Sequence, residues 1–336
     1  MKRARKAGLA LAVLGILLPV GWFAMRGTSL PRGTEVEVSI PAGSSVRAIA
    51  TRLDSAELID HPRLFALYVR LLGADADLKA GRYRFMAGMG YGEFIERLRS
   101  GAVVTFPLTI PEGLTLREVA PRIAEFTDDS VDAVREVLSD SVWVAGMHLP
   151  GPTLEGYLFP DTYRFSEDVG VREIVETMVS AYRAFWGPEE RALADSLDLT
   201  EREIVTLASI VEEEARVESE RPVIAGVYLN RMRRGMLLQA DPTVQYALGE
   251  PRARLLYRDI DSVADDPYNT YTQPGLPPGP IASPGAASLE ATLRPAEHTF
   301  LFFVARPDGS HEFTRTVREH NNAKNRIRRE RELDPP

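Results

Sequence analysis

The sequence predicts an α+β protein with a single N-terminal transmembrane helix, a small α/β module and a larger mixed α+β domain. Three observations lead to this fold class. They are an uncharged run at residues 7–25, a strand–turn–helix pattern that occurs twice, and a C-terminal part in which helical and strand-like periods follow one another. The chain has 336 residues, which is enough for two or three domains with hydrophobic cores of their own.

The composition narrows the classes of function. Hydrophobic residues make up 44% of the chain and charged residues 26%, as is typical of globular proteins. The net charge of −8 argues against a nucleic-acid partner. The absence of cysteine excludes disulfides, thiol nucleophiles and zinc–thiolate sites. The five histidines are scattered without the spacing of metal ligands, so we expect no metal site.

The N-terminal segment predicts a membrane anchor. Residues 1–6 are rich in lysine and arginine and form the expected cytoplasmic tail, because positive flanks stay inside. Residues 7–25 are long enough, as a helix, to nearly cross a hydrocarbon core of about 30 Å. The alternative is a cleaved signal peptide, although no small-x-small cleavage site follows the run. Both interpretations place the rest of the chain outside the cytoplasm.

A repeat defines the next part of the chain. Residues 40–53 recur as residues 110–123, and each copy follows an alternating segment that predicts a strand, at 35–40 and 103–110. Each copy then has a Pro-x-Gly turn and a Ser or Thr that can cap a helix. We expect the first copy to pack against helices at 61–72 and 91–99. This pattern fits either a generic element used twice or a small carbohydrate-binding or docking module.

Residues 107–324 form the expected larger domain, which the second repeat at 103–123 opens. Residues 130–200 are mostly helical in pattern, apart from an aromatic and proline-broken segment at 154–165. A capping box at Thr200 starts a helix that ends in three glutamates, and a second helix follows at 221–234. A short helix at 241–249, a proline-rich segment at 266–285 and two strands at 299–305 and 311–314 come next. A charged, frayed tail is expected at 325–336.

The glutamates at the end of the Thr200 helix are the first candidates for chemistry. Helical spacing places Glu212 over Ser209 and Ala208, and Glu214 over apolar residues. Burial among such neighbours disfavours the charged carboxylate, so either group is suited to act as a general acid near neutral pH. The simpler interpretation is a solvated helix end, because runs of acidic residues are common there.

Two further segments carry polar groups suited to a sugar ligand. In the first, Asp241 reads as a helix N-cap, while Gln239, Thr243 and Tyr246 offer hydrogen bonds. The second segment contains Asn269, Thr270 and Tyr271 and continues into a proline-rich stretch, which is stiff because proline fixes φ. Aromatic and amide groups on a rigid wall are typical of carbohydrate sites, although a long structural loop would have the same composition.

These segments, in this order, resemble the endolytic murein transglycosylase (YceG-like) family. The matching blocks are at residues 154–163, 208–214, 230–244 and 268–285, with a further signature at 320–321. The likeness includes the anchor and a LysM-like region at 26–106. It implies that Glu212 is the catalytic glutamate and that Glu214 is a second, supporting acid. Glu155 and Asp161 belong to the first block and complete the set of supporting candidates.

The resemblance implies a single-pass protein of the inner membrane whose extracytoplasmic domain cuts peptidoglycan glycan strands without metal or cofactor. Glu212 would protonate the oxygen between MurNAc and GlcNAc and then accept the proton of the C6 hydroxyl, leaving a 1,6-anhydro end. The resemblance also implies cell-wall synthases and the elongation machinery as partners. Two alternatives stay open: a non-catalytic glycan-binding scaffold, and a hydrolytic muramidase with Asp241 or Glu155 as its second carboxylate.

Overall fold

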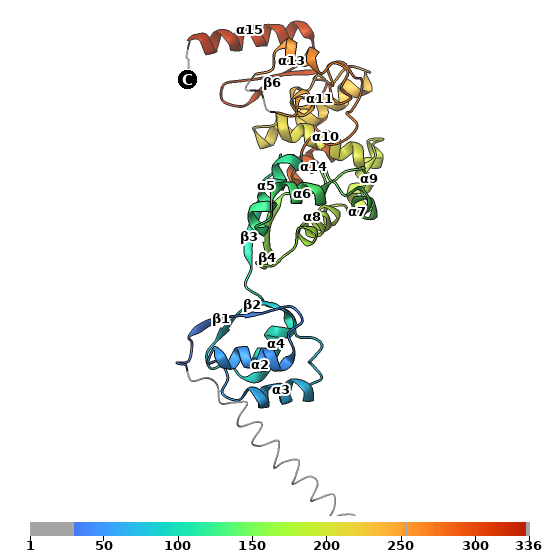
Figure 1. Cartoon of the computed structure of the whole chain (residues 1–336). Helices are drawn as coiled ribbons and strands as arrows, with labels where there is room; N and C mark the ends of the chain where they lie inside the picture. Colours follow the sequence, from blue (N-terminus) through green and yellow to red (C-terminus); the bar gives the residue numbers. More distant parts are fainter. Residues whose placement is uncertain (1–29, 251, 253, 334–336) are drawn as a thin grey trace, which may run out of the picture. The chain divides into compact units, whose positions relative to one another are not determined.

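The computed structural model describes residues 30–250, 252 and 254–333, and these residues form two compact units. The first unit extends to Pro107 and also includes residues 164–169, and the second contains residues 108–163 and 170 onward. The expectation of a mixed α+β fold is confirmed for these residues, with three two-stranded sheets among many helices (Figure 1). The expected anchor at 7–25 lies outside them. Among the described helices, none combines the length and apolar character needed to cross a bilayer.

The first unit is built on an antiparallel pair of strands that pairs Val38 with Tyr83. The alternation of the first strand places Val38 and Ile40 in the core, where Phe65 and Phe94 are also fully buried. Its elements are β1 (Glu35–Ile40), α2 (Val46–Ser55), α3 (Pro62–Leu71), β2 (Gly81–Met86) and α4 (Tyr91–Ser100). Ser45 caps α2 as its position in the repeat predicts.

The second unit begins at the second copy of the repeat. Here the strand is shorter than expected and starts at Phe106, because Val103 makes only an isolated bridge to Tyr83. The elements up to the candidate site are β3 (Phe106–Ile110), α5 (Leu116–Thr127), α6 (Val131–Leu138), α7 (Ser141–Gly146), β4 (Asp161–Phe165), α8 (Val171–Phe185) and α9 (Pro188–Ser196). Strand β3 pairs with β4.

The remaining elements include the helix α10, which packs against α11 and α14 (Figure 1). They are α10 (Glu201–Glu214), η1 (Glu218–Glu220), α11 (Arg221–Arg233), α12 (Asp241–Leu248), α13 (Tyr257–Ser262), α14 (Ala286–Leu293), β5 (Phe302–Ala305), β6 (His311–Thr314) and α15 (Val317–Leu333). The sequence patterns did not predict α13. Strand β5 starts at Phe302 rather than at 299.

The C-terminal segment differs from the expected frayed tail, because α15 continues through it to Leu333. Two causes are visible in the structure. Ala323 and Ile327 are buried on one face of the helix, and Arg326 pairs with Glu312 of the neighbouring strand β6. Tertiary contacts of this kind stabilise a charged helix that local composition alone leaves marginal.

Candidate active site

Helix α10 is the element that positions the candidate acids. Thr200 and Glu203 form the expected capping box. The backbone N–H of Glu203 donates to the hydroxyl of Thr200 at 3.3 Å, and the backbone N–H of Thr200 donates to the carboxylate of Glu203 at 2.8 Å. Every residue from Ile204 to Val211 is buried, so the helix is apolar on all sides and lies within the core. Its last turn therefore brings three consecutive glutamates to the edge of a rigid hydrophobic body.

Glu212 is bound by polar groups. Its Oε2 accepts a hydrogen bond of 3.0 Å from the backbone N–H of Gly285, and its Oε1 accepts one of 3.3 Å from Nη2 of Arg221. The side chain is only 8% exposed. The expectation of apolar neighbours is thus wrong for this carboxyl, because two hydrogen-bond donors from distant parts of the chain reach it. Periodicity along one helix does not predict such contacts.

Ser209 lies one turn before Glu212 and contacts the same distant segment. Its hydroxyl accepts a hydrogen bond of 3.0 Å from the backbone N–H of Ile281 and donates one of 2.7 Å to the carbonyl of Thr206. Residues three apart on α10 therefore hold the proline-stiffened segment at two points, Ile281 and Gly285. This double attachment fixes the direction in which the Glu212 carboxyl points.

The other two glutamates occupy different surroundings. Glu214 accepts a hydrogen bond of 2.8 Å from the hydroxyl of Tyr228 in α11, and burial raises its pKa to about 7. Glu213 is an exposed residue that lines a pocket, and desolvation there and the charge of Glu212 raise its pKa to about 7. Desolvation therefore raises the pKa of both glutamates that follow Glu212. The sequence patterns did not single out Glu213.

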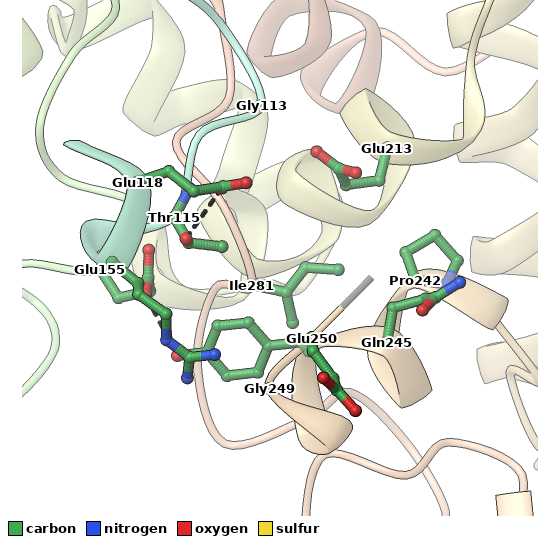
Figure 2. A pocket seen from close by; sticks show the side chains of 12 residues that line it. Gly113, Thr115, Glu118, Glu155, Glu213, Pro242, Gln245, Gly249, Glu250 and Ile281 are labelled. Carbon is green, nitrogen blue, oxygen red and sulfur yellow. Dashed lines mark hydrogen bonds between the residues drawn. The ribbon is translucent and has the colours of Figure 1, made fainter. Parts of the chain in front are cut away.

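The pocket beside Glu213 measures about 260 Å³, and Figure 2 shows its lining. Glu213 lies on one side, Thr115 and Glu118 of the second repeat lie on another, and Gln245 of α12 faces them. The full lining is Gly113, Thr115, Arg117, Glu118, Glu155, Glu213, Pro242, Gln245, Tyr246, Gly249, Glu250 and Ile281. Carboxylates, a guanidinium, an amide and a phenol on one concave surface suit a ligand that carries hydroxyl and acetamido groups.

Two of the expected supporting residues meet at this pocket. Glu155 accepts hydrogen bonds from the N–H of Leu116 at 3.0 Å and from the hydroxyl of Tyr246 at 3.2 Å. Burial raises the pKa of Glu155 to about 7. The ring of Tyr246 packs against Tyr268, with 4.7 Å between the ring centroids. The first sequence block and the proline-rich segment therefore meet at this pocket. Their order along the chain did not predict this contact.

Several other candidates use their polar groups within the protein. Thr243 and Thr270 are buried and share a hydrogen bond of 2.9 Å between their hydroxyls. Asn269 is fully buried, and its amide donates to the carbonyls of Ile260 and Val263 at 3.0 Å each. These side chains hold the loop in shape. The composition of the segment did not distinguish such groups from ligand-facing ones.

The remaining candidates differ in position from the expectation. Asp241 is the first residue of α12, whose N-cap is Ala240, so the expected N-cap role is wrong by one residue. Its carboxylate instead accepts a hydrogen bond from the hydroxyl of Tyr271. Gln239 is exposed, with a backbone φ of +48°, and Asp161 is exposed at the start of β4. Asp161 does not line the pocket described above.

The sequence analysis missed Arg221, Gly285 and Glu112 around Glu212, and it also missed Glu213, Arg117 and Gln245 of the pocket. Arg221 contacts Glu212 directly, and the side chain of Glu112 lies 3.9 Å from the same nitrogen of Arg221. A signal for Glu112 was present in the repeat, because the first copy has Ala42 at the equivalent place in its Pro-x-Gly turn. Within the described residues, no group of histidine and acidic side chains is arranged to hold a metal ion.

Comparison with known proteins gives consistent matches over most of the chain. The model of the YceG-like family matches residues 38–326. A Bacillus subtilis (strain 168) protein named endolytic murein transglycosylase is 37% identical over 307 residues, which is 87% of this chain and 84% of that protein. A protein of the same name from Streptococcus pneumoniae serotype 2 is 31% identical over 86% of this chain, but the match spans only 59% of its own length.

A solved structure is also similar. The crystal structure of a yceG-like protein from Listeria monocytogenes matches 87% of this chain and 99% of that chain, with 35% identity and a TM-score of 0.60. The match in sequence and the match in structure thus cover nearly the same share of the chain. The family model extends over the helix α10 and the segments that contact it.

Proposed function

The chain belongs to the YceG-like family, and from this premise we propose that it is an endolytic peptidoglycan lytic transglycosylase. Its substrate is the glycan strand, and the bond cleaved is the one between MurNAc and GlcNAc. The names of the relatives support the activity, and the pocket of carboxylate, guanidinium and amide groups next to Glu213 supports a sugar ligand. The reaction uses no water, so a single carboxyl group suffices where a hydrolase normally requires two.

Glu212 is the proposed catalytic residue. Its proton goes to the glycosidic oxygen as the bond to C1 of MurNAc breaks, and the GlcNAc end leaves with a hydroxyl group. The ionised carboxylate then accepts the proton of the MurNAc C6 hydroxyl, whose oxygen bonds to C1 and closes the 1,6-anhydro ring. This attack is intramolecular and therefore benefits from a high effective molarity. The carboxyl group ends protonated, as it began.

One observation carries this assignment: Glu212 is held by Gly285 and Arg221, directly after the buried stretch Ile204–Val211 of α10. The N–H of Gly285 and the positive charge of Arg221 both stabilise the carboxylate that exists between the two proton transfers. Glu214, by contrast, is hydrogen-bonded to Tyr228, and we propose that it supports the packing of α10 on α11.

The ligand-facing residues in this proposal are the ones around the pocket. Tyr246, Gln245 and Arg117 offer a ring, an amide and a guanidinium to the strand. Exposed Gln239 remains a candidate contact. The amide of Asn269 and the hydroxyl of Thr270 are engaged within the protein, so we assign them to the shape of the loop.

The test uses the full chain and defined glycan strands, with products analysed by mass spectrometry. Anhydro ends are about 18 Da lighter than the hydrolysed ends, because one water is missing. We expect the wild type to form anhydro ends and Glu212→Gln to form none while keeping its unfolding temperature. Glu125→Gln, which removes one charge at an exposed position of α5, is the matched control. Full activity of Glu212→Gln would refute the assignment.

A second candidate function, hydrolysis, is favoured by one specific observation. Glu112 provides a second carboxylate that shares Arg221 with Glu212, and paired carboxylates are typical of hydrolytic glycosidases. The expected alternatives, Asp241 and Glu155, are instead hydrogen-bonded to Tyr271 and Tyr246. Product ends that carry the added water would establish hydrolysis. Binding of strands without any cleavage would instead support a non-catalytic scaffold.

We further propose that residues 7–25 anchor the protein in the inner membrane with the catalytic domain outside the cytoplasm, and that residues 26–106 form a LysM-like glycan-binding module. The uncharged run and the basic residues before it support the anchor. Protease treatment of intact spheroplasts should degrade the catalytic domain. Cosedimentation of the chain with insoluble peptidoglycan, with and without residues 30–106, tests the module. Contacts with cell-wall synthases follow from the family resemblance and are testable by crosslinking in cells.

A further inference from the structure

The Pro-x-Gly turn of the second repeat is attached to the segment that binds Glu212. The N–H of Gly113 donates to the carbonyl of Ser283, and the N–H of Ser283 donates to the carbonyl of Leu114, each at 2.9 Å. The turn residue before Gly113 is Glu112, whereas the equivalent residue in the first repeat is Ala42. The copy next to α10 therefore carries an ionisable group that the other copy lacks.

Glu112 and Glu212 face the same nitrogen. Nη2 of Arg221 lies 3.3 Å from Oε1 of Glu212 and 3.9 Å from Oε2 of Glu112. The guanidinium cannot swing away freely, because its side chain is 14% exposed and its Nε donates to the hydroxyl of Ser288 at 3.0 Å. Two carboxyl groups thus share one positive charge.

The packing at Gly285 shows how closely the two acids approach. A Cβ atom at Gly285 would lie 1.8 Å from Oε1 of Glu112, so the Glu112 carboxyl occupies the space that a side chain would fill. The N–H of the same glycine is bonded to Glu212. Burial and then the negative charge of Glu212 raise the pKa of Glu112, while Arg221 lowers it. The electrostatic coupling between the two carboxyls is therefore direct.

We propose that Glu112 is a positioning residue for the reaction, which acts through Glu212 by keeping a proton on the pair that the two carboxyls form. This inference rests on the proposed function. Arg221 neutralises one negative charge, and a second ionisation would leave two like charges side by side, so the pair retains one proton to higher pH than a lone carboxyl. Glu112 is 47% exposed and Glu212 is 8% exposed, and the proton that the reaction uses is the one on Glu212.

Three charged groups face this pair, and all belong to the second unit. Arg221 at the start of α11 favours ionisation of the carboxyl pair. Glu213 at the end of α10 and Glu218 in η1 oppose it, since each adds negative charge next to one member of the pair. Neutralising Glu112 leaves Arg221 opposed by fewer negative charges, so the loss of activity at high pH should begin at lower pH. Neutralising Arg221 should have the opposite effect and move the loss of activity to higher pH.

The experiment is the pH profile of strand cleavage by the full chain, with anhydro ends counted by mass spectrometry. For Glu112→Gln we expect the descending limb at high pH to move down by about one pH unit, which is about a tenfold loss of rate above the limb and almost none well below it. For Arg221→Gln we expect the limb to move up. Gly285→Ala pushes the Glu112 carboxyl aside without removing it, and should move the limb in the same direction as Glu112→Gln but less far.

Glu125→Gln removes one negative charge at an exposed position of α5 and should leave the limb in place. Thermal unfolding of each variant identifies any that fail to fold, and the comparison is made among the folded ones. A Glu112→Gln rate that is lower by the same factor at every pH would show a purely structural role and overturn the inference, as would an unchanged profile. Complete loss of activity together with water-containing wild-type ends would make Glu112 a hydrolytic base instead.

The outcome is separable from that of the proposed function. If Glu212→Gln is inactive and anhydro ends form, but the Glu112→Gln profile is unchanged, the inference fails and the function stands. If Glu212→Gln remains active, the function itself fails. Opposite displacements for Glu112→Gln and Arg221→Gln would support the inference, because a loss of packing alone does not change sign between the two variants.

Discussion

Gly156→Ala tests how the first sequence block is fitted to the proline-rich segment. Gly156 has a backbone φ of +80°, which is unfavourable for residues with a Cβ atom. A Cβ atom there would lie 2.4 Å from Cβ and 2.5 Å from Cγ of Pro280, and 3.3 Å from Cγ1 of Val205. The first two contacts involve a stiff ring, so the neighbour cannot rotate away as a long side chain would.

The magnitude follows from two costs. The left-handed backbone conformation costs about 1–2 kcal/mol for a residue with a Cβ atom. Overpacking against Pro280 and Val205 adds about 1–3 kcal/mol. We therefore expect Gly156→Ala to lower the free energy of unfolding by about 2–5 kcal/mol, a large part of the usual stability of a domain of about 5–15 kcal/mol.

The assay is urea unfolding followed by circular dichroism on the chain from residue 30 onward. Gly146→Ala is the matched control, because it adds the same methyl group in α7 where no atom lies within 4 Å of the new Cβ and φ is not positive. The control should unfold at the wild-type urea concentration or slightly above it. A Gly156→Ala variant within about 0.5 kcal/mol of wild type would refute the packing described here.

Three further variants address other parts of the site. Glu214→Gln should change the pH dependence of stability. Burial raises the pKa of Glu214 to about 7. The stabilisation that the protonated Glu214 side chain contributes is therefore fully present below about pH 4.5 and is lost as pH rises through 7. As the pH rises from 5 to 8, the free energy of unfolding of the variant should therefore increase by about 1–2 kcal/mol relative to that of the wild type. This is less than a fully buried carboxyl would give, because Glu214 is only half-buried. Melting temperatures that change in parallel with pH for the two proteins would contradict this. Arg231→Met should destabilise the fold by about 3 kcal/mol in thermal unfolding, because the buried guanidinium donates to the carbonyls of Leu301 and Leu238, and an unchanged melting temperature would count against that role. Glu155→Gln keeps an acceptor for Leu116 or Tyr246 and should slow cleavage by less than about tenfold with the same anhydro ends, whereas complete inactivity would identify Glu155 as an essential acid.

Local signals in the sequence predicted most of the elements. The alternation at 35–40, the capping box at Thr200 and the proline at the start of α11 each depend on neighbouring residues, and strand β1 and helices α10 and α11 begin where these signals stand. The extent of α15 was not predicted, because it depends on burial of Ile327 and on a pair with β6.

The candidate site was predicted only in part, and for a physical reason. Burial of the end of α10 follows from its apolar sequence, but the partners of Glu212 come from the segment around Gly285 and from Arg221, and no spacing rule connects them. Polar residues in the loop at 268–271 gave a ligand-binding pattern, yet Asn269 and Thr270 are turned inward. A loop without regular structure must satisfy its own backbone, and its amides and hydroxyls are the groups available for that purpose.

The first unit is not one continuous stretch of chain, and this limits how it can be exchanged between proteins. Residues 164–169 belong to it, and through them Glu167 pairs with Arg82 at 2.5 Å while Arg164 donates to the hydroxyl of Thr105 at 3.0 Å. A gene fusion joined after residue 107 would transfer the module without these partners. Recombination at a single crossover point would separate the module from these partners in the same way. Chimaeric proteins built from this module therefore need residues 164–169 as well.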